Sequence, residues 1–159
     1  MINITLPDGN IKSFDFIPTG LDVAKSISEG LARNTVAVQI DSELVDLSCK
    51  IKKDSQIRLI TNIDDEALEI LRHSSAHIMA QAIQKLYKEA KLTIGPVVED
   101  GFYYDIDMEP VSEDDFEKIE AEIKKIIKQK FPFKRREVSK AEAMEFYKDE
   151  PYKLEMISE

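Results

Sequence analysis

The chain has 159 residues, of which 43% are hydrophobic and 33% charged, so it is globular and large enough for one ordinary domain or two small ones. Its net charge is -9, with -8 of that in residues 63–159, which disfavours diffuse attraction to nucleic acid. There is no apolar run of roughly 18 residues that could span a membrane, no signal-peptide pattern, and a single cysteine. We therefore expect a cytoplasmic protein that has no internal disulfide and does not enter a membrane.

Residues 1–62 show short strand patterns around one helix. Apolar residues alternate over residues 2–6, and the turn at residues 7–10 leads into a second arm at 11–16. Thr19 and Asp22 have the spacing of a capping box, which predicts a helix that ends at Gly30. Further strands are predicted at residues 36–40, 43–45 and 56–60, with a turn at Asp41-Ser42. This order predicts a small β-grasp, or ubiquitin-like, domain.

A long helix is predicted from the boundary at residues 62–65 to about Lys88, with Asp64 or Asp65 as its cap. It carries the only two histidines of the chain, His73 and His77. At four residues apart their side chains are offset by about 40° around the helix, so both imidazoles can act at one point. Its apolar stripe is predicted on roughly the opposite side and comprises Leu68, Leu71, Ile78, Ala82 and Leu86.

Three interpretations of this histidine pair are open. Such a pair is commonly solvated or held by hydrogen bonds in a core. A zinc site needs three or four ligands, and Cys49 lies in the other predicted domain. The spacing also matches the zinc-protease motif, but Ser74 occupies the position of its glutamate base. The residues alone therefore predict proton chemistry or a structural role, and no metal site in this chain.

A hairpin is predicted over residues 93–107, with arms at 94–98 and 102–107 and a turn at Glu99-Asp100-Gly101. Alternation places Tyr104 on the same face as Phe102 and Ile106, which favours a packing role. Gly95-Pro96 interrupts the first arm, so we expect a bend or a close approach of the backbone there.

The next helix begins after Ser112, with acidic residues in its first turn and lysines near its end. No acid interrupts the basic segment from residue 124 to residue 136. Its cations could contact the phosphates of a nucleic acid, or they could simply be solvated and complement the helix dipole. The candidate nucleic-acid contacts are Lys124, Lys125, Lys128, Lys134, Arg135 and Arg136, and Lys130 lies in the same segment.

The last part of the chain predicts an edge strand over 131–138, a short helix capped by Ser139 and Glu142 that runs to about Lys148, and a final strand over 152–157. The fold class is therefore α+β, with a β-grasp domain over 1–62 and a second α+β domain over 63–159.

This order of elements carries three sequence motifs. They are Leu-Glu-Ile-Leu-Arg-His-Ser-Ser-Ala-His at 68–77, Ile-Gly-Pro-Val at 94–97 and Gly-Phe-Tyr-Tyr-Asp at 101–105. Together they closely resemble the amino-terminal part of bacterial threonyl-tRNA synthetases. The resemblance implies a TGS domain over 1–62 and the first, truncated portion of a tRNA-editing domain over 63–159.

The resemblance implies a hydrolytic site that removes serine from mischarged seryl-tRNA(Thr). His73 would position or deprotonate the attacking water or a ribose hydroxyl, His77 would hold that network, and Lys153 would stabilise charge or bind substrate. Tyr104, Gly95 and Pro96 would shape the pocket around the aminoacylated 3′ end of tRNA(Thr).

The later Cys-x-x-x-His segment and the aminoacylation core of the family are absent from this sequence. We therefore expect a fragment that does not aminoacylate, hydrolyses weakly at most, needs no cofactor and is monomeric. For the full-length enzyme the resemblance implies ATP, Mg²⁺, Zn²⁺ and a homodimer. The alternatives are an RNA- or protein-binding module with structural histidines, and a metal-dependent hydrolase that would need further ligands.

Overall fold

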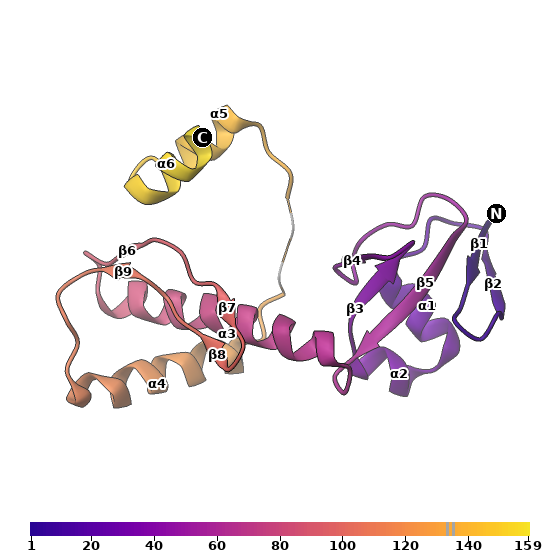
Figure 1. The fold of residues 1–159 in the computed structure, drawn as a ribbon, viewed down its shortest axis with the longest axis horizontal. Helices are drawn as coiled ribbons and strands as arrows, with labels where there is room; N and C mark the ends of the chain where they lie inside the picture. Colours follow the sequence, from indigo (N-terminus) through magenta and orange to yellow (C-terminus); the bar gives the residue numbers. More distant parts are fainter. Residues whose placement is uncertain (133, 135) are drawn as a thin grey trace. The chain divides into compact units, whose positions relative to one another are not determined.

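The computed structural model describes residues 1–132, 134 and 136–159, and it forms two compact units, residues 1–71 and residues 72–159. Figure 1 shows a sheet with helices in the first unit and mainly helices with short strand pairs in the second. The predicted α+β class is confirmed. The boundary expected after residue 62 stays a prediction, because the two compact units divide within a helix.

The first unit is a five-stranded mixed sheet in the order β2-β1-β5-β3-β4. β1 (Ile2–Thr5) pairs with β2 (Ile11–Phe14) in a hairpin, and β1 runs parallel to β5 (Ser55–Thr61) at the centre. β3 (Thr35–Ile40) lies antiparallel to β5 and to β4 (Glu43–Val45). Asp41 and Ser42 both have positive φ in the β3–β4 turn, which confirms the predicted turn. The β-grasp prediction is thus confirmed.

A hydrophobic core fills the space between this sheet and α1 (Gly20–Ile27). Thr19 and Asp22 form the predicted capping box at the start of α1. A Cβ atom at Gly20 would lie 2.6 Å from Cγ1 of Val38, so glycine lets α1 approach β3 closely. The core contains Ile4, Phe14, Val23, Val38, Ile51 and Ile57.

The prediction that Gly30 ends the helix is wrong. α1 ends at Ile27, and a second short helix, α2 (Glu29–Asn34), contains Gly30. The cause is Ser28, whose side chain accepts a hydrogen bond from the backbone N–H of Leu31 and so caps a new helix.

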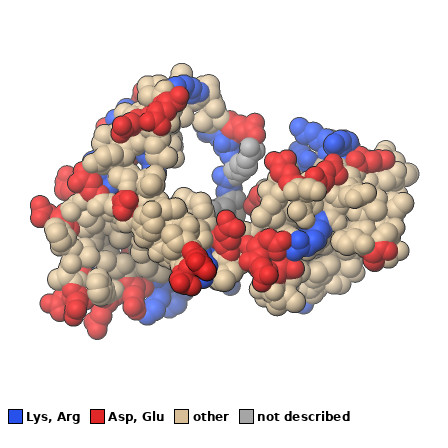
Figure 2. All heavy atoms as spheres, in the orientation of Figure 1, with Lys and Arg blue, Asp and Glu red and all other residues tan. Residues whose placement is uncertain are grey.

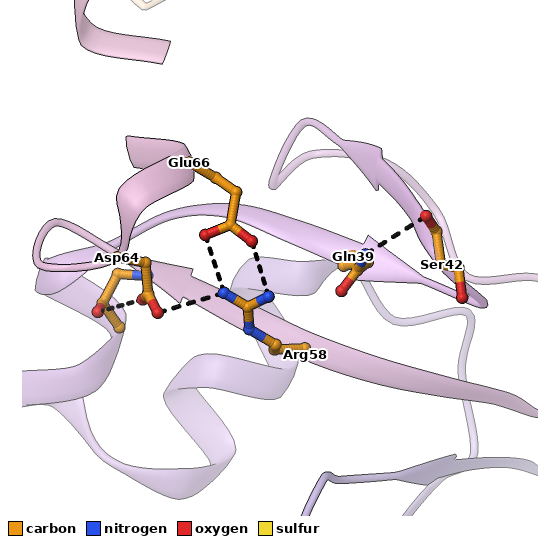
Figure 3. A network of polar contacts seen from close by, with 6 residues as sticks. Gln39, Ser42, Arg58, Asp64 and Glu66 are labelled. Atoms are coloured by element: carbon orange, nitrogen blue, oxygen red, sulfur yellow. Dashed lines mark hydrogen bonds and ion pairs between the residues drawn. The ribbon is translucent and has the colours of Figure 1, made fainter. Parts of the chain in front are cut away.

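The first turns of α3 (Asp65–Leu86) are joined to this sheet by an ion-pair network (Figure 3). The Arg58 guanidinium donates to both carboxylate oxygens of Glu66, at 2.8 and 2.9 Å, and to Asp64 at 3.3 Å. The other oxygen of Asp64 accepts from the backbone N–H and the hydroxyl of Thr61, each at 2.7 Å. These bonds lower the pKa of both carboxyls and raise that of Arg58. Buried Ala67 adds an apolar contact with Ile60.

The buried face of α3 is lined mainly by alanines. Ala76, Ala80 and Ile83 are buried, whereas Leu68, Leu71 and Leu86 are 49%, 62% and 39% exposed. Of the predicted apolar stripe, Ala82 is buried and Ile78 is half-buried, so the stripe as a whole was predicted wrongly. Long aliphatic side chains suggested the buried face, but small ones allow close packing there.

The predicted hairpin over 93–107 forms only short ladders. β6 (Lys91–Leu92) pairs with β9 (Ile106–Asp107), and β7 (Val97–Val98) pairs with β8 (Gly101–Phe102) around the predicted turn. Gly95-Pro96 and Tyr104 lie in the irregular stretches between the ladders. Tyr104 therefore does not follow the strand alternation from which its packing role was argued.

α4 (Glu113–Gln129) begins at Ser112 as predicted and packs Ile119 on α3 residue Ile83 and on Ala90. The predicted edge strand over 131–138 is wrong for the part that the structure describes, where no strand is assigned; Phe133 and Arg135 lie outside it. α5 (Lys140–Phe146) has the predicted capping box of Ser139 and Glu142.

The predicted final strand over 152–157 is also wrong, because this stretch is the helix α6 (Pro151–Ser158). Proline at the first helical position has the φ angle that a helix needs, and its missing N–H costs nothing there. That signal outweighs the alternating apolar residues. The change matters for function because Lys153 now lies in the first turn of a helix.

Candidate active site

His73 and His77 meet on the surface of α3 within the second unit. Their Nε2 atoms lie 2.9 Å apart, and the ring centroids are 4.7 Å apart with an interplanar angle of 59°. The four-residue spacing thus brings the two imidazoles together as expected. Both residues are exposed, so neither is buried by the packing of α3.

This contact fixes how the pair can hold protons. At 2.9 Å one Nε2 donates and the other accepts, so one ring is protonated on Nε2 and the other is not. The donating ring can take up a further proton on Nδ1 and keep the contact. Two imidazolium rings would place hydrogens on both facing nitrogens and break it. The pair can therefore accept one proton from a water or hydroxyl group.

The environment keeps His77 neutral at pH 7. Partial burial, the neighbouring His73 and the charge of Lys153 all lower the pKa of His77 below its ordinary value of 6.5. A neutral imidazole is the form that accepts a proton, so His77 is suited to base chemistry.

Lys153 reaches this site from the first turn of α6. Its ammonium group donates to the backbone carbonyl of Thr93 at 2.7 Å and is half-buried. Its charge acts on His77, which places the lysine and the histidine pair in one electrostatic environment. An ammonium group has three hydrogens, so Lys153 can donate to a ligand while it keeps its hydrogen bond to the Thr93 carbonyl.

Gly95 and Tyr104 are packed against each other. A Cβ atom at Gly95 would clash with Cδ2 of the Tyr104 ring, so only glycine admits the ring at this distance. Burial, Glu150 and Tyr147 raise the pKa of Tyr104, in that order of importance. The close backbone approach that was predicted at Gly95-Pro96 is confirmed, and it makes room for the tyrosine ring.

Gln84 and Glu150 were not predicted as site residues. The Gln84 amide donates to Oε1 of Glu150 at 3.0 Å and connects α3 to the residue before α6. The sequence does place Gln84 on the histidine face of the helix, but nothing in it points to Glu150. The other Glu150 oxygen, Oε2, is buried without a hydrogen-bond partner among the described residues.

The basic segment lies elsewhere, at the end of α4 and beyond it. Lys124 is paired with Glu120 at 3.3 Å and Lys125 with Glu122 at 3.2 Å. The remaining described candidates, Lys128, Lys134 and Arg136, are exposed, and Arg135 lies outside the described residues. On the face seen in Figure 2, basic side chains form small separate groups among acidic ones.

Within the described residues, no group of three or more His, Cys, Asp or Glu side chains is arranged to hold a metal ion. No helix in this described part is long and apolar enough to cross a membrane.

Comparison with known proteins matches residues 2–61 to the TGS domain family. The whole chain is similar to threonine–tRNA ligases. It is 63% identical to that of Desulforapulum autotrophicum over 158 residues, which are 99% of this chain and 25% of the relative. It is 63% identical to that of Desulfatibacillum aliphaticivorans, over 100% of this chain and 25% of the relative, and 50% identical to that of Staphylococcus saprophyticus, over 98% and 24%.

The family resemblance inferred from the motifs is confirmed. Residues 2–61 are a TGS domain. The chain spans about a quarter of the length of the curated relatives it matches.

Proposed function

We propose that this chain is part of a threonyl-tRNA synthetase and supplies one side of an editing site that hydrolyses seryl-tRNA(Thr). The observation that carries the proposal is the hydrogen-bonded pair of His73 and His77, with the Lys153 ammonium in the same environment. Similarity to threonine–tRNA ligases along the whole chain supports the substrate class.

An enzyme that attaches threonine needs such a site for a physical reason. Serine lacks one methyl group of threonine, and a binding pocket discriminates a single methyl by only about 1–3 kcal/mol. A second site that hydrolyses the wrong ester supplies the missing selectivity. Ester hydrolysis needs an oriented nucleophile, a proton acceptor and a positive or hydrogen-bonding group for the developing oxyanion.

The histidine pair supplies the proton acceptor. His73 positions or deprotonates the water or the terminal ribose hydroxyl, and His77 holds that network through the contact between the Nε2 atoms. The lowered pKa of His77 keeps its ring neutral at pH 7 and ready to share the proton. The leaving ribose oxygen then takes a proton back from the pair as the ester bond breaks.

Lys153 and Tyr104 supply charge and shape. The ammonium of Lys153, anchored on the Thr93 carbonyl, stabilises negative charge that develops on the ester oxygen. Tyr104, seated on Gly95, forms a wall against which the aminoacylated 3′ end packs, with Pro96 beside it.

tRNA(Thr) is the partner under this proposal. The side chains of Lys124 and Lys125 are 70% and 69% exposed, and ion pairs made by exposed lysines are weak, so these lysines are available to phosphates. The acidic balance of the chain limits such contacts to local groups like the basic segment. ATP, Mg²⁺ and Zn²⁺ would serve aminoacylation in the remaining part of the enzyme.

The test is to measure the hydrolysis of seryl-tRNA(Thr) and threonyl-tRNA(Thr) by the complete polypeptide that carries this sequence, and by the 159-residue chain alone. We expect the complete polypeptide to hydrolyse the seryl ester faster than the threonyl ester, and the chain alone to be weak or inactive. Equal rates for the two esters, or no hydrolysis of either, would refute the editing proposal.

A further inference from the structure

The charge of Lys153 acts on His77 from a separate helix, so the position of α6 relative to α3 must be fixed. We propose that Gln84 and Glu150 are positioning residues, whose hydrogen bond holds the first turn of α6 and its Lys153 against the histidine face of α3. The catalytic consequence rests on the proposed editing function, whereas the positioning itself does not.

The placement of Gln84 on α3 supports this role. Gln84 lies seven residues after His77, which is an offset of about 20° around the helix and about 10 Å along it. Both side chains therefore project from one face. Gln84 extends that face from the proton-accepting pair to the end of the helix that α6 approaches.

The placement of Glu150 on the other side is equally direct. Glu150 is the residue that precedes α6, and Lys153 follows within the first turn. Its carboxylate does not cap its own helix, because no side-chain cap hydrogen bond is made there. It is turned instead to Gln84 at 3.0 Å, across 66 residues of sequence.

The burial of Glu150 makes this hydrogen bond costly to lose. Glu150 is partly buried, and its Oε2 has no donor among the described residues, so Gln84 provides the compensation shown for this carboxylate. Removing one partner of a buried polar pair leaves the other unsatisfied. A free carboxylate would turn toward water and carry the first turn of α6 with it.

Other contacts hold the same segment to the short strands. Lys91 donates to the backbone carbonyl of Asp149 at 3.1 Å, and the Tyr152 hydroxyl donates to Asp107 at 2.8 Å. These bonds keep α6 attached to β6 and β9 when the Gln84–Glu150 bond is broken. Lys153 itself stays bonded to the Thr93 carbonyl at 2.7 Å, so we expect the loss of the Gln84–Glu150 bond to shift Lys153 relative to His77 without unfolding the segment.

The test uses Glu150→Ala and Gln84→Ala, which break the bond, and Glu150→Gln, which removes the charge but keeps an oxygen that accepts from Gln84. The first readout is the pKa of His77 by NMR titration of the 159-residue chain, whose only two histidines give a simple spectrum. The second is kcat and KM for seryl-tRNA hydrolysis by the complete polypeptide.

We expect both alanine variants to raise the pKa of His77 toward 6.5, because the charge of Lys153 moves away. If Glu150→Ala acted only by removing the negative charge of Glu150, the pKa of His77 would fall. The direction of the change therefore separates displacement of Lys153 from loss of the Glu150 charge. We expect kcat to fall about 10- to 100-fold, as for a small misplacement of a catalytic group, with KM little changed. Glu150→Gln should resemble the parent in both readouts.

The proposal is overturned if the alanine variants leave the pKa of His77 unchanged or lower it, or if Glu150→Gln behaves like Glu150→Ala. A parent polypeptide that shows the expected titration but no hydrolysis of seryl-tRNA would refute the editing function and leave the positioning role intact. Gln84→Ala breaks the same bond without a folding defect being expected, because alanine is the residue most compatible with a helix interior.

Discussion

The two units of this chain differ in their cores and in their candidate site residues. Among the residues that the structure describes, the large side chains that are fully buried all lie in the first unit, for example Ile4, Val38 and Ile60. The second unit has alanine-lined packing on α3, a few isoleucines and strand pairs of two residues each. It nevertheless holds both histidines, Lys153 and Tyr104.

The difference shows that individual hydrogen bonds can position the side chains of a site in a unit that has only a small hydrophobic core. In the second unit individual hydrogen bonds fix the side chains that matter, such as Lys153 on Thr93 and Gln84 on Glu150. In the first unit one hydrophobic core joins strands β1, β2, β3 and β5 to α1. Mutations should therefore act globally in the first unit and locally in the second.

The largest effect on stability is expected from Ile4→Ala in the first unit, compared with Ile119→Ala in the second. Truncating a fully buried isoleucine costs about 2–5 kcal/mol in free energy of unfolding. We expect Ile119→Ala to cost less, because that side chain lies near the surface at 9% exposure. Urea unfolding can be followed by far-UV circular dichroism, and by tyrosine fluorescence for the second unit, which contains all five tyrosines. An equal or larger cost at Ile119 would contradict the comparison.

Helix caps should show the same contrast on a smaller scale. Thr19→Ala should cost about 1 kcal/mol, because α1 is packed into the core of the first unit. Ser139→Ala removes a similar capping box from α5, which buries no residue, so the loss should appear as local fraying. Hydrogen exchange of the two helices measures both effects, with Thr19→Ser as the conservative control. A global loss of protection in Ser139→Ala would show that α5 is coupled to the rest of the unit.

The same contrast explains what the sequence could predict. Alternating apolar residues, the capping box at Thr19 and the turn at Asp41-Ser42 identify the β-grasp unit, because its elements are local and amphipathic. In the second unit Pro151 signals a helix start, yet residues 152–157 alternate like a strand. Only the packing of α6 on β6 decides between the two.

The site was predictable to a similar degree. Helical spacing alone brings His73 and His77 together, since their contact lies within one helix. The packing of Tyr104 on Gly95 and the hydrogen bond from Lys153 to Thr93 depend on contacts across the unit. The sequence predicted a bend or a close approach at Gly95-Pro96, whereas a role for Lys153 was expected only through the family resemblance. Glu150 carries no sequence signal, because its partner Gln84 is distant in the chain.

Breaking the Arg58 network should have a smaller effect on stability than removing a cap, because its side chains are 30–40% exposed. Asp64 and Glu66 have pKa values below their ordinary 3.8 and 4.5, so they stabilise the folded state above those values. That contribution is lost as the pH falls through the lowered pKa values. The difference in unfolding midpoint between the parent and Arg58→Met should therefore shrink on acidification. A constant difference down to pH 3 would contradict this account.

The smallest effect is expected in the pH dependence of the site. The positive charge of Lys153 helps to lower the pKa of His77, so the acidic limb of kcat/KM for seryl-tRNA hydrolysis should have its midpoint below pH 6.5. Lys153→Met should move that midpoint to higher pH, and Lys153→Arg should leave it near the parent value. An unmoved midpoint in Lys153→Met would show that the charge does not reach His77.

Seryl-tRNA hydrolysis by His73→Ala in the complete polypeptide tests the central claim most directly. Gln81→Ala, an exposed change four residues beyond His77 on the same helix, is the matched control. Removing a positioned acid–base group typically costs about 10² to 10⁴-fold in rate, so we expect His73→Ala to lose editing by that factor with an unchanged unfolding midpoint, and the control to keep the parent rate. A folded His73→Ala variant that hydrolyses seryl-tRNA at the parent rate would contradict the account.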